Sequence, residues 1–490
     1  MDDLSENKGR FSFKEFTQEF VNLEIEANLL NGTTTISKIW ERIRFAVHQE
    51  ISIKIGIDER SKPAPFIKKD SFITSKLKST KICKKLSPYF KLFSRNPYFI
   101  LKKPDIVLFG HARRKKNNDG LYEDIYTDRL ISSITNYKTL SIEFPYYGSH
   151  MIPELTPNLY YSDFANSIYF LKTKSNKLKL NYLDDDLNKI KETENKILEI
   201  FGINIDLKQI FDKAYKKMLI YPDIYRKLLK YLKPKIVIIL VSYGKEDLIE
   251  AAKSLNIPTI EIQHGVLNNM HMGYCFPPPL VKSTFPDYFF SFGEYWNKAS
   301  LFPIPDNKIF TFGYPYLTEQ INTIDRKKSN IILFLSQPNS SISLTDYAIK
   351  IADKYLNNYK IIFKLHPNQY RTWQNDLPKL NEASDKGLIK VIDTDTPTLY
   401  QLQAEAIFQI GVNSTALFEG LALKCRTIIL KVPGYEYMET LAENNIVRIN
   451  DHDDLNLENV PEPPDDDNYF FDKNWRNNFS TALESIINKI

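Results

Sequence analysis

Apolar residues in this chain form short continuous runs that alternate with stretches of helical period. The clearest run is Lys235–Val241, which is β-branched and apolar almost throughout. A helical pattern follows over 246–255, and a second apolar run covers 257–262. Continuous apolar runs of this length are typical of strands buried on both faces of a parallel sheet. The segment therefore predicts one strand–helix–strand unit.

The same alternation continues in the second half of the chain. Strands are expected at 330–335, 360–365, 406–410 and 426–432, and helices at 344–356, 399–406 and 414–423. Strands that alternate with helices predict a doubly wound parallel sheet. Because 490 residues are too many for one core, we expect two such α/β domains.

The remaining patterns place elements around these two domains. Two helices are expected over 13–56 with a break at Gly32–Thr35, strands at 105–109 and 139–144, helical pattern over 185–232, and a last amphipathic helix over 475–490. The acidic, proline-rich stretch 451–472 is expected to be an exposed connection. We expect an N-terminal domain over 1–285, a C-terminal domain over 286–474, and a final helix at 475–490 that can cross back to the first domain.

Composition excludes several function classes. The chain has only 16 glycines and contains neither GxGxxG nor GxxxxGK[ST], which argues against a dinucleotide-binding oxidoreductase and a P-loop enzyme. The three cysteines are far apart and show no zinc pattern, which fits a reducing compartment. The N-terminal residues do not resemble a signal peptide, and no apolar run is long enough to cross a bilayer. We expect a cytoplasmic protein whose membrane association, if it has one, is peripheral.

The net charge of +5 is unevenly distributed. Residues 67–103 contain eleven Lys and Arg, one acid (Asp70), and interleaved aromatic residues. Such a segment is suited to the anionic inner face of the cytoplasmic membrane, with cations on phosphates and rings at the interface. It could equally be a solvated basic face without function. Nothing else in the sequence resembles a nucleic-acid-binding module, so no nucleic-acid partner is expected.

Polar residues follow the expected strands, where ligands of doubly wound sheets bind. After the strand at 257–262, Gln263 and His264 are expected to point towards a cleft between the domains, with Glu261 beside them and Gly265 allowing close approach of the backbone. His264 could donate to a phosphate or carry a proton. His271, a few residues later, is a weaker candidate.

Three further clusters follow strands of the second domain. Lys364, His366 and Pro367 end one strand, and their cations could neutralise a departing nucleotide phosphate. Asn413, Ser414 and Thr415 begin a helix whose free N–H groups can bind an anion, although Ser414 could simply be an N-cap. Glu419 could hold ribose hydroxyls, and Gln337 could border the donor.

The first domain supplies candidates for the acceptor side. His111, Arg113 and Arg114 follow the strand at 105–109, and the acids Asp124, Asp128 and Glu143 come after them. Asp124 or Glu143 could act as a base or nucleophile. No acidic cluster stands at a strand end as a metal site would require. The Asp393–Asp395 pair precedes a helix and is expected to cap it.

Three stretches resemble bacterial capsule and O-antigen glycosyltransferases of the GT-B type. They are IEIQHGVLNNMHMGY, then FPDYFFSFGEYW with FTFGYP, and then KLHP with NSTALFEGLAL, within residues 235–435. The resemblance implies two Rossmann-like domains facing a central cleft. By resemblance to enzymes that use CMP-Kdo or CMP-sialic acid, His366, Pro367, Asn413, Ser414 and Thr415 would hold the nucleotide phosphate. The QHG motif of Kdo transferases falls on Gln263, His264 and Gly265.

The function that this resemblance implies is transfer of a sugar, Kdo or a sialic-acid-like sugar, from a CMP-activated donor to a growing, lipid-linked surface polysaccharide. Such enzymes need no metal or other cofactor. The sialyltransferase-type acidic motif ending in glycine is missing, apart from Asp119–Gly120, so the base stays open between His264, Glu261, Asp124 and Glu143. A CDP-polyol phosphotransferase and a non-catalytic GT-B scaffold are the alternatives.

Overall fold

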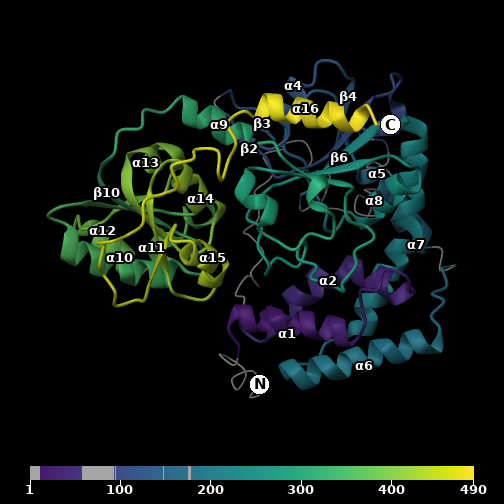
Figure 1. Cartoon of the computed structure of the whole chain (residues 1–490), viewed down its shortest axis with the longest axis horizontal. Helices are drawn as coiled ribbons and strands as arrows, with labels where there is room; N and C mark the ends of the chain where they lie inside the picture. Colours follow the sequence, from purple (N-terminus) through teal and green to yellow (C-terminus); the bar gives the residue numbers. More distant parts are fainter. Residues whose placement is uncertain are drawn as a thin grey trace, which may run out of the picture. The chain divides into compact units, whose positions relative to one another are not determined.

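The computed structural model describes residues 11–57, 93, 95–117, 119–146, 148–174 and 178–489, and these form two compact units. The first unit comprises the described parts of 19–51, 66–316 and 474–490, and the second comprises those of 1–18, 52–65 and 317–473. Figure 1 shows the chain with its helices and strands labelled. Each unit is described separately below.

The first unit is built on a seven-stranded parallel sheet with the order β5-β4-β1-β6-β7-β8-β9. The strands are β1 (Ile106–His111), β4 (Thr139–Phe144), β5 (Leu159–Tyr161), β6 (Ile236–Leu240), β7 (Thr259–Ile262), β8 (Tyr288–Ser291) and β9 (Ile309–Thr311). A separate antiparallel pair consists of β2 (Lys115–Lys116) and β3 (Tyr122–Glu123). The order places β1 next to β6, and the chain changes direction across the sheet between these two strands.

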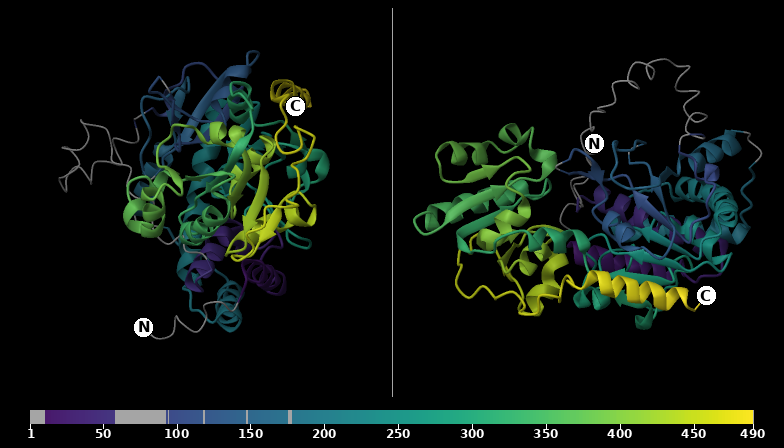
Figure 2. Two further views of the ribbon diagram at one scale, coloured as in Figure 1. Left: turned by 90° about the vertical axis from the view of Figure 1, so that its left-hand side faces the viewer. Right: turned by 90° about the horizontal axis from the view of Figure 1, so that it is seen from above.

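Helices cover the first sheet because its strands are apolar on both faces. They are α2 (Thr35–Lys54), α4 (Asp128–Ser133), α5 (Asp163–Lys174), α6 (Asp184–Phe201), α7 (Leu207–Leu232), α8 (Glu246–Lys253) and α16 (Trp475–Ile487), with short 3-10 turns η2 (Pro97–Phe99), η3 (Glu294–Lys298) and η4 (Asp306–Lys308). Helices α5, α7 and α8 bury one core with Val107, Phe109 and Val237. Helix α16 packs Phe479 against Phe290 and Phe312, and it lies along this unit in both Figures 1 and 2.

The second unit contains a six-stranded parallel sheet with the order β12-β11-β10-β13-β14-β15. The strands are β10 (Ser329–Leu335), β11 (Lys360–Lys364), β12 (Lys390–Ile392), β13 (Ala406–Gly411), β14 (Arg426–Leu430) and β15 (Arg448–Asn450). The helices are α10 (Ser341–Tyr355), α11 (Trp373–Asp376), α12 (Pro378–Asp385), α13 (Leu399–Glu405), α14 (Thr415–Ala422) and α15 (Glu439–Glu443), with 3-10 turns η5 (Pro367–Gln369) and η6 (Tyr435–Met438).

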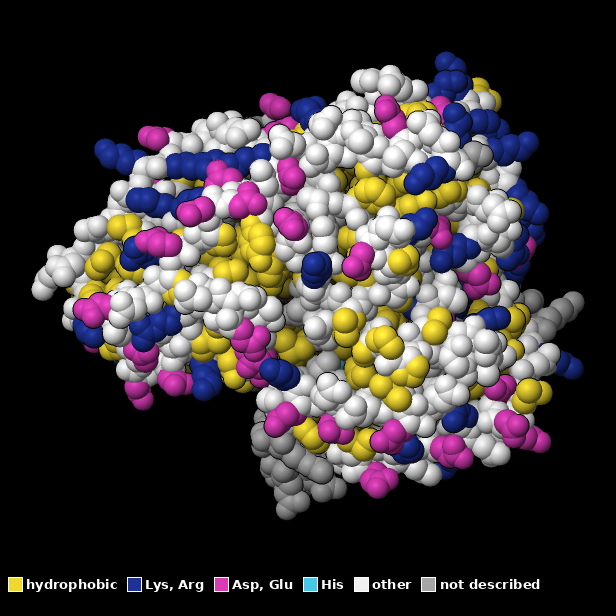
Figure 3. All heavy atoms as spheres, viewed as in Figure 1, with side chains coloured by type: hydrophobic (Ala, Val, Ile, Leu, Met, Phe, Trp, Pro, Cys, Tyr) yellow, Lys and Arg dark blue, Asp and Glu magenta, His cyan; other side chains and the backbone are white. Residues whose placement is uncertain are grey.

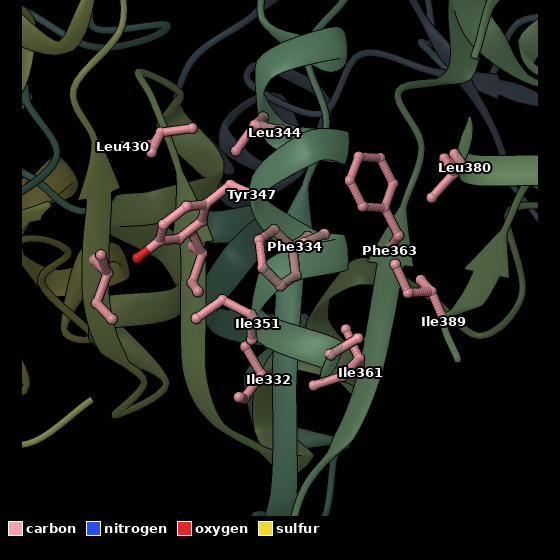
Figure 4. Packing of buried hydrophobic residues seen from close by; sticks show 14 of the residues in the cluster. Ile332, Phe334, Leu344, Tyr347, Ile351, Ile361, Phe363, Leu380, Ile389 and Leu430 are labelled. Atoms are coloured by element: carbon pink, nitrogen blue, oxygen red, sulfur yellow. The ribbon is translucent and has the colours of Figure 1, made fainter. Parts of the chain in front are cut away.

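The core of the second unit lies between this sheet and α10. Figure 4 shows Phe334 and Phe363 from neighbouring strands beside Tyr347 and Ile351 of the helix, and all four side chains are completely buried. The rings of Phe334 and Phe363 stack with their centroids 5.9 Å apart. Burial of apolar area on this scale is the main force that holds a sheet and a helix together.

The predicted α/β architecture with two Rossmann-like units is confirmed, and so are the additional N-terminal helices. All the strands predicted from apolar runs are present, and 13–56 forms α1 (Phe13–Glu26) and α2. The sequence did not indicate β5, β8, β9, β12 and β15, which have only three or four residues. A strand that short shows no recognisable period, and most of these five lie at sheet edges.

Two predictions about organisation need correction. The boundary at residue 285 does not match the first sheet, since β8 and β9 lie beyond it and pair with β7 and with each other. The stretch 451–472 is not simply exposed, because Leu457, Val460 and Phe470 are buried. Its acidic residues face solvent, while these apolar side chains attach the connection to the unit.

Within the described parts of the chain, no helix is both long and apolar enough to cross a membrane. Figure 3 shows acidic side chains among the lysines and arginines over most of one face. The basic aromatic segment 67–103 lies outside the described residues as far as 92, so only Phe93 and 95–103 can be placed.

Candidate functional site

Each sheet has a switch point, where neighbouring strands connect to opposite sides. In the first unit it lies between β1 and β6, and in the second between β10 and β13. Ligands of doubly wound sheets bind outside the carboxyl ends of the strands at such points. His111 ends β1, and Gln337 and Asn413 follow β10 and β13. The topology therefore brings residues predicted from sequence to both switch points.

In the first unit, His264 lies between two tyrosines. The Tyr274 hydroxyl is 3.4 Å from His264 Nδ1, and the Tyr243 hydroxyl is 3.3 Å from His264 Nε2. Tyr274 also bonds to Glu261 Oε1 at 2.5 Å. Burial, with smaller contributions from His271, His111 and Arg113, lowers the pKa of His264 to about 3. The imidazole is therefore neutral at pH 7, with one ring nitrogen as a hydrogen-bond donor and the other as an acceptor.

Glu261 is completely buried in β7. Its Oε1 accepts hydrogen bonds from Tyr274 and from the Ser242 N–H at 3.0 Å, and its Oε2 has no hydrogen-bond partner. Burial raises the pKa of Glu261 to about 7, although Ser242, Tyr274 and Lys282 lower it. A carboxyl group that titrates near neutral pH at the end of a parallel strand is typical of a functional site.

Arg113 and Lys245 make the β1–β6 end of this edge positive, and His111 lies beside them as a neutral ring. Burial lowers the pKa of His111 to about 4, with Lys245 and Arg113 contributing. Burial also lowers the pKa of Lys245 to about 8, and its ammonium group lies 4.0 Å from the centre of the Phe144 ring. Arg113 is exposed. These cations can attract an anionic group to the edge.

Glu143 and Arg114 form a buried ionic cluster with His150, a residue that the sequence did not single out. Glu143 bonds to Arg114 Nε and to His150 Nδ1, each at 2.5 Å, and His150 Nε2 is 2.7 Å from Asp163. Burial lowers the pKa of His150, but Asp163 and Glu143 raise it by more, so it lies above its ordinary value. Glu143 and Arg114 thus form a buried ion pair. This favours a structural role for both residues over the acceptor-side roles expected for them.

Asp124 is almost fully buried and closes the turn before α4. Its Oδ1 accepts the Tyr126 and Thr127 N–H groups, while Oδ2 has no hydrogen-bond partner and faces Gly110. Burial and the neighbouring Asp128 raise the pKa of Asp124 to about 6. Asp128 itself accepts the Thr156 hydroxyl and the Asp124 N–H. The pKa of Asp124 is thus raised for an aspartate, but its side chain is almost inaccessible from the surface.

Gln263 does not project towards a ligand as predicted. It is completely buried, its amide Nε2 donates to the Gly265 carbonyl at 2.8 Å, and its Oε1 accepts the Phe292 N–H at 2.8 Å. The amide therefore ties the end of β7 to the end of β8. The sequence alone could not distinguish the two roles, because a glutamine after a strand can either bond to buried backbone groups or contact a ligand.

In the second unit, Gln337 and Asn413 bond to each other across the switch point. Gln337 Nε2 donates to the Asn413 carbonyl, and the Asn413 N–H donates to Gln337 Oε1 at 3.2 Å. Asn413 Nδ2 then donates to the Gly434 carbonyl at 2.8 Å. A Cβ on Gly434 would lie 2.2 Å from Asn413 Nδ2. The loops after β10, β13 and β14 are thus joined by hydrogen bonds at one edge.

Helix α14 starts at this edge. Ser414 is its N-cap, with its hydroxyl accepting the Ala416 N–H at 3.2 Å, and Thr415 is the first helical residue. The buried Gln409 donates to the Leu417 carbonyl, and Gln403 donates to that of Ala416, which holds the first turn in place. The helix end can attract an anion through its dipole and free N–H groups. Glu419 is buried against Tyr400, at 3.5 Å, which leaves little access for ribose.

His366 and Pro367 begin η5, directly after β11. His366 Nδ1 accepts the Asn368 N–H at 3.2 Å, so in the neutral ring the proton is on Nε2. Lys364 donates to the Tyr370 hydroxyl at 2.7 Å and to the Thr394 carbonyl. Asp393 accepts the Trp373 indole N–H, and Thr398 rather than Asp395 caps α13. The prediction that the Asp393–Asp395 pair is a helix cap is therefore wrong.

Sequence reasoning missed Tyr243, Tyr274, Lys245 and His150. Tyr243 and Lys245 follow the strand β6, and their position after a buried strand was an available signal. Tyr274 and His150 come from loops and reach their partners only through folding. Among the described residues, no group of three or more His, Cys, Asp or Glu is placed to hold a metal ion.

No protein-family model matches the chain, and no curated protein matches its sequence. Solved structures show a distant likeness. A putative UDP-N-acetylglucosamine 2-epimerase from Listeria monocytogenes is 11% identical with a TM-score of 0.46, covering 80% of this chain and 98% of that one. The UDP-GlcNAc 2-epimerase of Methanocaldococcus jannaschii is 14% identical with a TM-score of 0.43, covering 78% and 99%. Acinetobacter baumannii MurG is 12% identical with a TM-score of 0.42, covering 79% and 100%. Likenesses this weak carry no assignment of function.

Proposed function

We propose that this chain is a metal-independent glycosyltransferase of the GT-B type that transfers a sugar from a CMP-activated donor to a growing surface polysaccharide, such as capsule or O-antigen. The observation that carries the proposal is the position of polar side chains at the carboxyl edges of both sheets. In both parallel sheets, polar side chains lie at the carboxyl edge: Gln337 and Asn413 in the second unit and His264 and Tyr274 in the first.

The nucleotide is proposed to bind the second unit. Its phosphate would meet the N–H groups at the start of α14, with Nε2 of His366 as a further donor. Donors aimed at a departing phosphate stabilise the charge that develops as the bond breaks. Asn413 and Gln337 would keep the loops of this edge in register through the bonds described above. Lys364 is proposed to act through Tyr370, to which it is bonded.

The first unit is proposed to handle the sugar and its acceptor. The acceptor hydroxyl attacks the anomeric carbon, its proton passes to His264, and the bond between that carbon and the phosphate oxygen breaks, which releases CMP. His264 is preferred to Asp124 and Glu143 as the base, because its side chain is partly exposed, whereas both carboxyl groups are buried and bonded within the fold. Kdo and sialic-acid-like sugars carry a carboxylate, which Arg113 and Lys245 could attract. The acceptor is proposed to be lipid-linked.

A nucleotide panel tests the proposal. Thermal unfolding of the full chain would be recorded with CMP, CDP, UDP and GDP, and CMP is expected to raise the Tm most. H366A should lose most of that rise, whereas H452A should keep it, because His452 bonds to Lys350 away from the proposed contacts. A larger rise with UDP or GDP would contradict the cytidine donor, and no rise with any nucleotide would contradict the transferase.

A donor assay then separates the two enzyme classes. Incubation with a CMP-sugar and a glycolipid acceptor should release CMP and yield a polymer without added phosphate. Phosphate in the polymer would instead indicate a CDP-polyol phosphotransferase. Full polysaccharide production by cells carrying both H264A and H366A would indicate a scaffold without catalytic activity.

A further inference from the structure

Tyr274 stands between the buried carboxyl group and the imidazole of the first unit. Its hydroxyl is 2.5 Å from Glu261 Oε1 and 3.4 Å from His264 Nδ1, and the tyrosine is completely buried. Glu261 and His264 have no direct bond in the structure as described. The tyrosine oxygen is therefore the link through which the carboxyl group can influence the ring.

The hydrogen bonds of this group can have only one direction when Glu261 is ionised. A carboxylate has no proton to give, so the Tyr274 O–H donates to Glu261. The Tyr274 oxygen then accepts from His264 Nδ1–H, and Nε2 is left as the acceptor, which the Tyr243 hydroxyl contacts at 3.3 Å. Burial raises the pKa of Tyr274 well above its ordinary value, so the phenol keeps its proton throughout.

The loop that carries Tyr274 is held rigidly by α2. The buried Arg44 donates to the carbonyls of Met272 and Cys275, at 2.8 and 2.6 Å, and is itself paired with Glu24. Gly273 provides the close approach, because a Cβ there would lie 2.7 Å from the Tyr243 ring. The residues on both sides of Tyr274 are thus fixed, and its hydroxyl cannot easily turn away.

We propose that Tyr274 is a positioning residue that couples ionised Glu261 to His264 and fixes the imidazole with its proton on Nδ1 and its acceptor at Nε2. The inference rests on the proposed function and deepens it. Holding the base in the right tautomer is worth a large share of the rate in enzymes that use a neutral histidine. The proton of the acceptor hydroxyl would go to Nε2, while Glu261 stabilises the charged ring through Tyr274.

The coupling makes activity depend on pH through Glu261. Groups facing Glu261 are Ser242, Tyr274 and Lys282, and groups facing His264 are His271, His111 and Arg113. Since the pKa of Glu261 is about 7 and that of His264 about 3, Glu261 is the member of this pair that changes charge between pH 6 and 8. Asp124 and Lys245, with pKa values of about 6 and 8, also titrate near this range, which is why the comparison with E261Q is needed. The rate should rise with pH as Glu261 ionises, and in E261Q this rise should be absent.

The test compares Y274F with Y347F, which also removes a buried tyrosine hydroxyl, but in the second unit, where Tyr347 bonds to the Asp454 carbonyl. Y274F should lower kcat roughly ten- to a hundredfold with little change in KM, whereas Y347F should not. In ¹⁵N NMR of the full chain, His264 should carry its proton on Nδ1, and Y274F should shift the tautomers towards Nε2–H.

Equal kcat in the two variants together with an unchanged His264 tautomer would overturn the inference. A wild-type chain that transfers no sugar from any CMP donor would refute the proposed function instead. The NMR measurement would still decide the role of Tyr274 in that case, because it needs no substrate.

Discussion

Glu261 shows at the residue scale how a side chain can weaken the fold and still be retained. It is completely buried, one of its oxygens has no hydrogen-bond partner, and Lys282, the cation that lowers its pKa, is bonded to Glu246. Ionised carboxylates in such surroundings cost stability unless they are fully paired. A buried acid with an unpartnered oxygen at a strand end is better explained by function than by folding.

The pKa of Glu261 gives a prediction with a definite sign. Its pKa rises from 4.5 to about 7 on folding, so the folded state prefers the protonated acid and loses stability as pH rises above 4.5. The loss is complete above about pH 7 and is on the order of 3 kcal/mol. E261Q, which mimics the protonated acid, should therefore increase the free energy of unfolding at pH 8 and change it little at pH 4.5. Urea unfolding at the two pH values measures this.

The matched control is Glu246, another buried acid of the same unit. Glu246 is paired with Lys282 at 3.1 Å, and both side chains are buried. E246Q leaves that ammonium group unpaired, which should destabilise the unit by about 3 kcal/mol at pH 8. If both variants destabilise the protein alike, Glu261 is an ordinary buried acid and its raised pKa is not expressed in the folded chain.

At the scale of elements, the second unit depends on three loops that meet after β10, β13 and β14. Gln337, Asn413 and Gly434 connect them through amide and backbone bonds, and α14 starts from the middle loop. The arrangement matters even if neither Gln337 nor Asn413 contacts the ligand, since the loops set the position of the free N–H groups of α14.

Substitution of Gly434 tests this arrangement. Its φ is +98°, and an added Cβ would displace the Asn413 amide, so G434A should weaken CMP binding about tenfold. The control is G387A, because Gly387 also has positive φ, at +73°, but has nothing within 4 Å of an added Cβ. Both variants should lose about 1–2 kcal/mol of stability to backbone strain. Calorimetric titration with CMP should separate them, and equal affinities would exclude a role for Asn413.

At the scale of the whole molecule, segments that are far apart in the sequence belong to the same unit. The last helix, α16, packs on β8 and β9 of the first unit, although nearly 160 residues of the second unit separate it from them in sequence. The first unit therefore combines segments that lie on both sides of the second unit in the sequence. The second unit contains no segment from the region between residues 66 and 316.

The proposed membrane contact also belongs to this scale. The described end of the basic segment exposes Phe99 and Leu101, with relative accessibilities of 60% and 96%, next to the exposed Lys102 and Lys103. Apolar side chains beside cations suit the surface of an anionic bilayer. The double variant F99E/L101E should reduce sedimentation with phosphatidylglycerol vesicles severalfold, while I342E, at a 67% exposed position of the second unit, should not. Equal losses in both would exclude a specific surface.

The longer strands could be predicted from the sequence, and the shortest could not. β6, β10 and β13 lie within continuous apolar runs, and burial on both faces of a sheet demands such runs. The three-residue strands β5, β9, β12 and β15 were not predictable, because pairing with a neighbour, not their own composition, makes them strands. For the same reason the boundary near residue 285 was misplaced.

The candidate site was predictable in position and less so in partners. That His264, His366 and Asn413 follow strands could be read from the sequence, and topology brings each to a carboxyl edge. That Glu143 is paired with Arg114 and His150 could not be read, since these residues come from three separate segments. The buried role of Gln263 could not be read either, since one of its backbone partners, Phe292, follows the next strand.

The sequence by itself determined that this protein has two parallel sheets and which residues stand at the ends of their strands, because both follow from local period and burial. Only the tertiary structure decided which of those residues are paired, buried or partly accessible, because charge pairing and desolvation depend on neighbours that are distant in the chain. The role proposed for Tyr274, between Glu261 and His264, depends entirely on such tertiary contacts.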